Sequence, residues 1–150
     1  MLSLAVNNQT RRNVPDIPFS VIVKKVLNRR VRYDLSLVFV TPAKARALNR
    51  TYRRKSYEAN VLSFLLSENS GEIFINLSLA EREAKKFDES YRDHIAHLLI
   101  HGLLHLKGMA HGSKMEKEEK NFLHYFTNDQ KSHRRPGHRH LVDQTRHLRK

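Results

Sequence analysis

The stretch from Ser90 to Gly108 constrains the fold more than any other part of the chain. It begins with Ser90-Tyr-Arg-Asp93, which fits a capping box, where the Ser hydroxyl and the acidic residue three positions later satisfy free backbone N–H groups. An apolar and histidine-rich run follows from His94 to Leu106. Gly108 suits the left-handed residue that ends a helix. The sequence therefore predicts one long helix over this stretch.

Shorter apolar patterns predict the remaining elements. Apolar alternation and β-prone runs predict strands over residues 2–6, 35–40, 61–66 and 71–77, and helical spacing predicts helices over 18–30, 42–52, 79–87 and 114–126. The mixture predicts an α+β fold, a small mixed β-sheet packed with several helices as an α/β/α layered sandwich. We expect Phe64 in the core, together with the run of Leu62, Leu65 and Leu66. We expect Tyr52 to pack against the sheet.

Charge is distributed over the whole chain of 150 residues, which is the length of one domain. The net charge is +13, and residues 127–150 contribute +5 of it, so residues 1–126 carry +8. Such a field attracts polyanions, namely RNA, DNA or an anionic membrane surface. We expect one domain over 1–126 and a basic, flexible extension over 127–150, whose histidines (His133, His138, His140 and His147) can bind metal or RNA.

Several classes of protein are excluded by what the sequence lacks. The chain has no Cys, so it has no disulfide, thiolate metal site or Cys nucleophile. No apolar run reaches the roughly 18 residues that a bilayer span needs. The N-terminus has no secretory pattern. We therefore expect a cytoplasmic protein with no membrane partner.

Three histidines at the end of the long helix predict a metal site. His101 and His105 are four residues apart, so their rings lie about 40° apart around the helix and about 6 Å apart along it. Gly108 lets the chain turn back, and His111 can then reach the same ion. Three neutral imidazoles with an open fourth position are a catalytic zinc arrangement. His97 is another possible ligand. The alternative interpretation is that His94, His97, His101 and His105 form a surface stripe or are satisfied polar groups along a helix.

The spacing resembles the zinc motif of metzincin proteases, His-Glu-x-x-His-x-x-Gly-x-x-His. Gly102 stands where those enzymes have the Glu that acts as general base. This difference argues against peptide hydrolysis by that route.

A closer resemblance is to the YbeY family of bacterial rRNA maturation factors. Residues 101–111, His-Gly-Leu-Leu-His-Leu-Lys-Gly-Met-Ala-His, are similar to its signature His-Gly-x-Leu-His-Leu-x-Gly-Tyr-Asp-His. Residues 48–55, Leu-Asn-Arg-Thr-Tyr-Arg-Arg-Lys, resemble its Leu-Asn-x-x-Tyr-Arg-x-Lys, and residues 60–64 resemble its Asp/Asn-Val-Leu-Ser-Phe. Ala59 replaces the usual Thr, and Met109 and Ala110 replace Tyr-Asp. The resemblance covers roughly residues 2–126.

This resemblance implies a zincin-like fold with one Zn²⁺ on His101, His105 and His111 and water as the fourth ligand. It implies a single-strand-specific endoribonuclease that acts in small-subunit rRNA 3′-end maturation and ribosome quality control, with Arg53 as the functional arginine. Its implied partners are rRNA, the ribosomal small subunit and a ribosomal protein or assembly GTPase, without DNA. The Asp that Ala110 replaces would orient an imidazole, so its loss predicts metal affinity weaker by about 10–100-fold.

The hypothesis for the chemistry is phosphodiester hydrolysis in which Arg53 pairs with the phosphate. The neighbouring cations Arg50, Arg54 and Lys55 form a candidate RNA-contact patch, and Tyr52 and Tyr57 can stack bases. Glu58 and Glu72 are candidates for the general base by elimination.

Two alternatives remain open from sequence. One is another zinc hydrolase such as a metallopeptidase. The other is a non-catalytic RNA- or ribosome-binding protein whose metal is structural.

Overall fold

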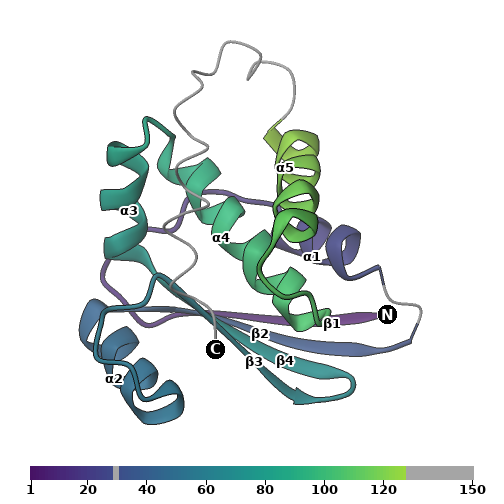
Figure 1. Cartoon of the computed structure of the whole chain (residues 1–150), viewed down its shortest axis with the longest axis horizontal. Coiled ribbons are helices and arrows are strands. Elements are labelled where there is room, and N and C mark those ends of the chain that lie inside the picture. The colour runs from purple at the N-terminus through teal and green to yellow at the C-terminus, as the bar shows by residue number, and fades with distance from the viewer. Residues whose placement is uncertain (29–30, 128–150) are drawn as a thin grey trace.

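The computed structural model describes residues 1–28 and 31–127, which form one sheet with helices on both faces (Figure 1). The strands are β1 (Leu2–Asn8), β2 (Tyr33–Val40), β3 (Val61–Ser67) and β4 (Ser70–Asn76). The helices are α1 (Phe19–Leu27), α2 (Pro42–Arg53), α3 (Leu77–Lys86), α4 (Tyr91–Leu106) and α5 (Ser113–Thr127). The expected C-terminal extension lies, apart from Thr127, outside the described residues.

The sheet has the strand order β1-β2-β4-β3. β1, β2 and β4 are parallel, and β3 runs antiparallel to β4 through a hairpin. The sheet is therefore mixed, and β3 forms one of its edges.

Helix α4 is the centre of the layer that also contains α1, α3 and α5 (Figure 1). Thirteen of its 16 residues are buried, and they include the polar side chains of Asp93, His94, His97 and His101 beside the apolar ones. The Ser90 hydroxyl accepts a hydrogen bond of 3.0 Å from the Asp93 N–H, and Gly108 has φ +94°. These observations confirm the predicted helix. No helix among the described residues is long and apolar enough to cross a bilayer.

Helix α2 covers the opposite face of the sheet (Figure 1). Ala45 packs there with Val38, Val40 and Phe74. The helix begins after Thr41, whose hydroxyl accepts a hydrogen bond of 3.2 Å from the Lys44 N–H. The α/β/α layering predicted from the sequence is therefore confirmed.

Two expectations about the strands were wrong. Leu77 begins α3 instead of ending β4, because the Asn76 side chain caps that helix by accepting from the Leu79 N–H at 3.2 Å. Leu65 and Leu66 are 62% and 61% exposed. They lie outside the core because β3 is an edge strand and they lead into the hairpin.

Candidate metal centre

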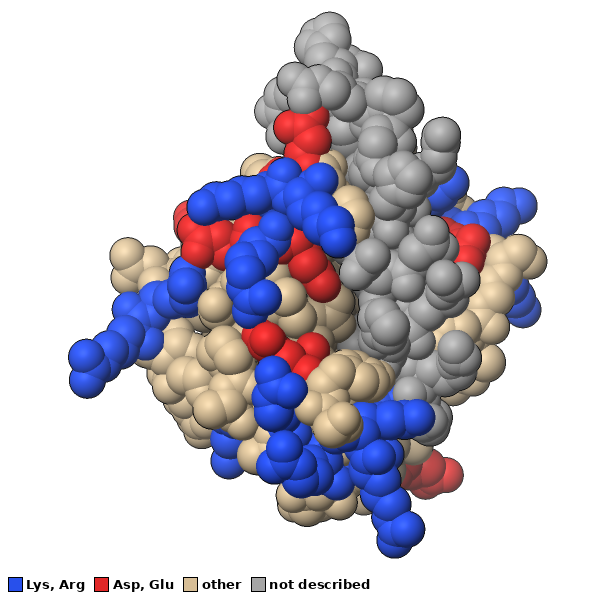
Figure 2. All heavy atoms as spheres, turned by 60° about the vertical axis from the view of Figure 1, so that its left-hand side comes forward, with Lys and Arg blue, Asp and Glu red and all other residues tan. Residues whose placement is uncertain are grey.

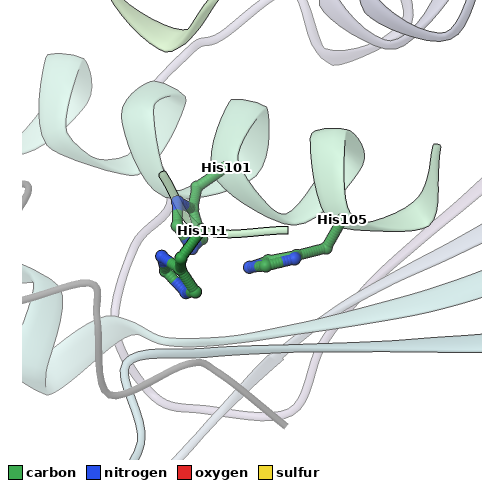
Figure 3. A group of neighbouring side chains, drawn as sticks. All are labelled: His101, His105 and His111. Atoms are coloured by element: carbon green, nitrogen blue, oxygen red, sulfur yellow. The ribbon is translucent and has the colours of Figure 1, made fainter. Parts of the chain in front are cut away.

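Three imidazoles converge where α4 ends (Figure 3). His101 and His105 extend from successive turns of α4, and His111 extends from the loop beyond Gly108. The ring centroids are 4.7 Å apart for His101 and His105, 5.1 Å for His101 and His111, and 4.8 Å for His105 and His111. One nitrogen from each ring lies within 4.8 Å of the others. The predicted trio is thus brought together in space.

Hydrogen bonds fix which nitrogen of two of these rings can bind a metal. His105 Nδ1 lies 3.0 Å from the Met109 carbonyl oxygen, and His101 Nδ1 contacts a carboxylate oxygen of Glu119. Carbonyl and carboxylate oxygens accept, so each Nδ1 carries the proton and donates. The lone pair of each ring is therefore on Nε2, as metal-binding imidazoles with an oriented second nitrogen require.

The donor set fits a divalent metal such as Zn²⁺. The Nε2 atoms of His101 and His105 are buried and have no hydrogen-bond partner among the described residues. Burial lowers the pKa of His105 to about 4, and the neighbouring imidazoles of His101 and His111 add to the effect. The ring is consequently neutral at neutral pH and its lone pair is available. Three imidazoles match the ligand chemistry of a catalytic zinc site.

Glu119 of α5 is a residue that sequence analysis missed. Its carboxylate accepts from His97 Nε2 at 2.9 Å through one oxygen and from His101 Nδ1 through the other. Burial raises the pKa of Glu119, but the hydrogen bonds from His101 and His97 outweigh it and hold the pKa at about 2. His97 therefore contacts this carboxylate and is not part of the histidine trio.

A signal for Glu119 is present in the sequence. It lies four residues after Met115 and four before Leu123, and all three are buried on one face of α5. A carboxylate on the apolar face of a helix needs a partner, since burying an unpaired charge is costly. This carboxylate orients the His101 imidazole. In the family signature, that kind of role was expected of the Asp that Ala110 replaces.

A pocket of about 800 Å³ opens beside the imidazoles. One wall comes from the end of α2, one from β3 and one from the α4–α5 turn. The lining residues are Tyr52, Arg53, Arg54, Val61, Ser63, Phe64, His105, Leu106, Gly108, Met109, Ala110 and His111. Arg53 and Arg54 thus share a pocket with two of the imidazoles, whereas Arg50 and Lys55 do not line it.

Arg53 is half-buried at the end of α2. Burial lowers the pKa of its guanidinium, and Tyr57 opposes the shift. The group still carries its charge, because a free guanidinium titrates above pH 12. Partial burial makes this charge a stronger anion ligand than a fully solvated one.

The two general-base candidates lie elsewhere. Glu58 accepts from Arg82 at 2.7 Å and from Asn76 at 2.9 Å. Glu72 lies on β4 opposite Phe64. No Asp or Glu is among the pocket-lining residues of the described chain.

Gly102 is required by close packing of α4 on β3. A Cβ at this position would lie 2.8 Å from Ser63 Oγ and 3.3 Å from two carbons of Ile73. Ser63 in turn donates to the Gly102 carbonyl at 3.0 Å. A side chain here, such as the Glu of metzincins, would crowd Ile73 and force the Ser63 hydroxyl away from the Gly102 carbonyl.

Comparison with known proteins agrees with this arrangement. Residues 5–127 match the family model described as endoribonuclease YbeY, which is most of the chain. The chain belongs to the YbeY family. The YbeY match includes α2, β3 and the α4–α5 turn, the three walls of the pocket.

Individual YbeY relatives come from diverse bacteria. The protein named endoribonuclease YbeY of Aster yellows witches'-broom phytoplasma is 37% identical over 123 residues, covering 75% of this chain and 83% of the relative. That of Chromobacterium violaceum is 32% identical over 128 residues, covering 77% and 76%. That of Phytoplasma mali is 39% identical over 88 residues, and the chain spans 60% of its length.

A solved structure shows the same fold. The solution structure of TM1509 from Thermotoga maritima superposes with a TM-score of 0.61 at 18% identity, over 89% of this chain and 94% of that one. Membership of the YbeY family supports an endoribonuclease role for the chain.

Proposed function

We propose that the chain is a zinc-dependent, single-strand-specific endoribonuclease that acts in small-subunit rRNA 3′-end maturation and ribosome quality control. One observation supports this most strongly. The imidazoles of His105 and His111 and the guanidinium of Arg53 line the same pocket. A metal ligand set and a half-buried cation that line one pocket suit the binding of a phosphodiester.

The roles of the side chains follow from their contacts. His101, His105 and His111 would hold the metal, with Glu119 and the Met109 carbonyl keeping two of the rings in the required tautomer. Zinc with three imidazoles supplies a Lewis acid and brings the ionisation of water to about pH 7. Arg53 pairs with the phosphate oxygens and stabilises the charge that develops on them.

The surface around α2 suits an RNA backbone. Between Pro42 and Tyr57 the chain has six cationic residues and no acidic one; the cationic residues are Lys44, Arg46, Arg50, Arg53, Arg54 and Lys55. Figure 2 shows Lys and Arg side chains gathered at the lower end of this face, where α2 lies. Binding through such contacts weakens steeply with salt. We propose rRNA of the small subunit as the partner, with a ribosomal protein or assembly GTPase, in the cytoplasm and without DNA or membrane.

Of the two alternatives, a peptidase lacks support at Gly102, which replaces the metzincin Glu and is closely packed against the Ser63 and Ile73 side chains. The other alternative, a non-catalytic RNA binder with a structural metal, predicts RNA binding without metal-dependent cleavage. The experiment below distinguishes it from the enzyme.

The experiment combines metal analysis with RNA cleavage, each with and without chelator. We expect His105→Ala to abolish both metal binding at the site and cleavage. His124→Ala, which removes an exposed histidine of α5 and leaves the tail histidines in place, should retain both. Cleavage that persists in a verified metal-free His105→Ala protein would refute the zinc mechanism.

A second variant tests the phosphate contact. We expect Arg53→Ala to retain metal and to lower cleavage by roughly 10²–10³-fold, the usual loss for a group that stabilises transition-state charge. Arg32→Ala, at a surface Arg whose side chain is 68% exposed and pairs with Asp34, is the matched control. RNA binding without cleavage in every sample would favour the non-catalytic alternative.

A further inference from the structure

Tyr52 packs against the sheet through Phe64, as predicted, yet most of its side chain remains exposed. It is 66% exposed, lies one residue before Arg53, and lines the pocket together with His105 and His111. An exposed aromatic residue alone indicates little, since many proteins have them. The aromatic and cationic residues next to Tyr52 indicate more.

The Tyr52 ring packs on Phe64, which in turn packs on Phe74. Its centroid lies 5.5 Å from that of Phe64 with the planes at 62°, and Phe64 lies 5.9 Å from Phe74 at 70°. Edge-to-face contacts of this kind are favourable. Phe74 packs on the α2 side of the sheet with Val38, Val40 and Ala45. Phe64 thus packs against the Tyr52 ring while most of the Tyr52 side chain faces solvent. A contact surface that is already ordered loses little conformational entropy on binding.

The charges next to the ring favour a polyanion as the occupant. Arg53 and Arg54 follow Tyr52 in sequence and line the same pocket, and none of the described residues that line it is acidic. Aromatic platforms flanked by cations are how proteins bind single-stranded nucleic acid without sequence preference, because every base has a π-face.

We propose that Tyr52 stacks one nucleobase of single-stranded RNA while Arg53 and Arg54 hold the adjoining phosphates. The inference rests on the proposed function for its substrate class and adds a base-binding subsite next to the metal centre. It also gives a physical source of single-strand selectivity. A base within a duplex is stacked on its neighbours and cannot offer its face to the ring.

The test measures binding apart from cleavage. Full-length protein with its metal is titrated into a fluorescently labelled, 2′-O-methylated single-stranded RNA, whose integrity is checked afterwards. We expect Tyr52→Ala to weaken binding roughly tenfold and Tyr52→Phe to restore it, because both rings stack. Tyr125→Ala is the matched control, since Tyr125 is 59% exposed but lies on α5 outside the pocket.

An abasic series distinguishes stacking from a structural effect. Each nucleotide in turn is replaced by an abasic one. At one position the abasic nucleotide should lower the RNA affinity of the wild type about tenfold. The same replacement should not lower the affinity of Tyr52→Ala any further. The inference is overturned if Tyr52→Ala lowers the affinity for every oligonucleotide equally. It is also overturned if Tyr52→Ala binds RNA as tightly as the wild type. Equally tight Tyr52-dependent binding of duplex RNA or of an acidic peptide overturns it as well.

The outcomes also separate this inference from the proposed function. RNA cleavage combined with binding that does not depend on Tyr52 overturns the subsite and leaves the nuclease standing. Base-dependent binding through Tyr52 without metal-dependent cleavage supports the subsite and overturns the nuclease.

Discussion

His94 and His105 lie on the same helix, yet their surroundings give them opposite chemistry. His94 contacts Glu89 through Nδ1 at 2.9 Å and Glu83 through Nε2 at 2.8 Å, and its side chain is fully buried. His105 contacts the Met109 carbonyl through Nδ1 alone, and its Nε2 has no partner among the described residues. A ring with both nitrogens occupied ties α3 to α4, whereas a ring with one nitrogen available can bind a metal.

The pKa values of the two rings shift in opposite directions. Burial lowers the pKa of His94, but the hydrogen bonds and charges of Glu83 and Glu89 outweigh burial and raise it. Burial lowers the pKa of His105 to about 4, and no carboxylate hydrogen-bonds its ring. The structural ring of His94 thus has carboxylates at both nitrogens, whereas His101 and His105 each keep Nε2 without a hydrogen-bond partner among the described residues.

The largest expected effect comes from His94→Ala. Glu83 and Glu89 then lose their imidazole partner inside the protein, and breaking a buried charged pair in this way costs about 3–5 kcal/mol of unfolding free energy. Urea unfolding of the chelator-treated protein measures this. His105→Ala, measured in the same way, should cost much less, because it removes a ring with one unsatisfied nitrogen.

The exposed His124 on α5 provides the control, since its replacement by Ala should change stability by less than about 0.5 kcal/mol. If His94→Ala and His105→Ala destabilise the metal-free protein equally, the proposed contrast between a structural His94 and a metal-binding His105 is wrong.

Glu119→Gln should have the next largest effect, on the metal centre. The amide keeps the size of the side chain but removes the charge that orients His101, and loss of such a partner lowers metal affinity by about 10–100-fold. Competition with a chromophoric chelator measures the affinity directly. The ¹⁵N shifts of His101 should also show mixed tautomers in the metal-free variant, a signature that simple loss of stability would not produce.

Glu116→Gln is the matched control, because Glu116 is exposed on the same helix. Unchanged affinity and an unchanged His101 tautomer in Glu119→Gln would show that the ring is oriented without this carboxylate.

Sequence alone predicted the features that depend on local chemistry. The start of α4 at Ser90, the start of α2 at Thr41 and the turn at Gly108 each rest on residues within one helical turn, and all three are present. The trio of His101, His105 and His111 was equally local, because a single helix and its exit loop carry it.

The features that sequence analysis missed depend on how elements far apart in the sequence pack against one another. Glu119 reaches His101 because α5 packs on α4, a contact that no local pattern specifies. Leu65 was assigned to the core from its apolar character, but the strand order places β3 at the sheet edge and leaves Leu65 exposed. Tyr52, at the end of α2, contacts Phe64 of β3 yet is 66% exposed. Glu58 was proposed by elimination and is engaged with Arg82 and Asn76 instead.

The smallest expected effect is a pH dependence that arises from His94. Its pKa is higher in the folded protein than the ordinary value of about 6.5. The charged ring therefore stabilises the fold fully below about pH 6.5, while Glu83 and Glu89 are ionised, and this contribution is lost as the pH rises through the folded-state pKa. The difference in unfolding free energy between wild type and His94→Gln should accordingly shrink from pH 6 to pH 9. Chelator must be present throughout, because metal binding adds its own pH dependence. A difference that stays constant or grows with pH would mean that His94 is neutral in the fold, and the contrast with His105 would then rest on hydrogen bonding alone.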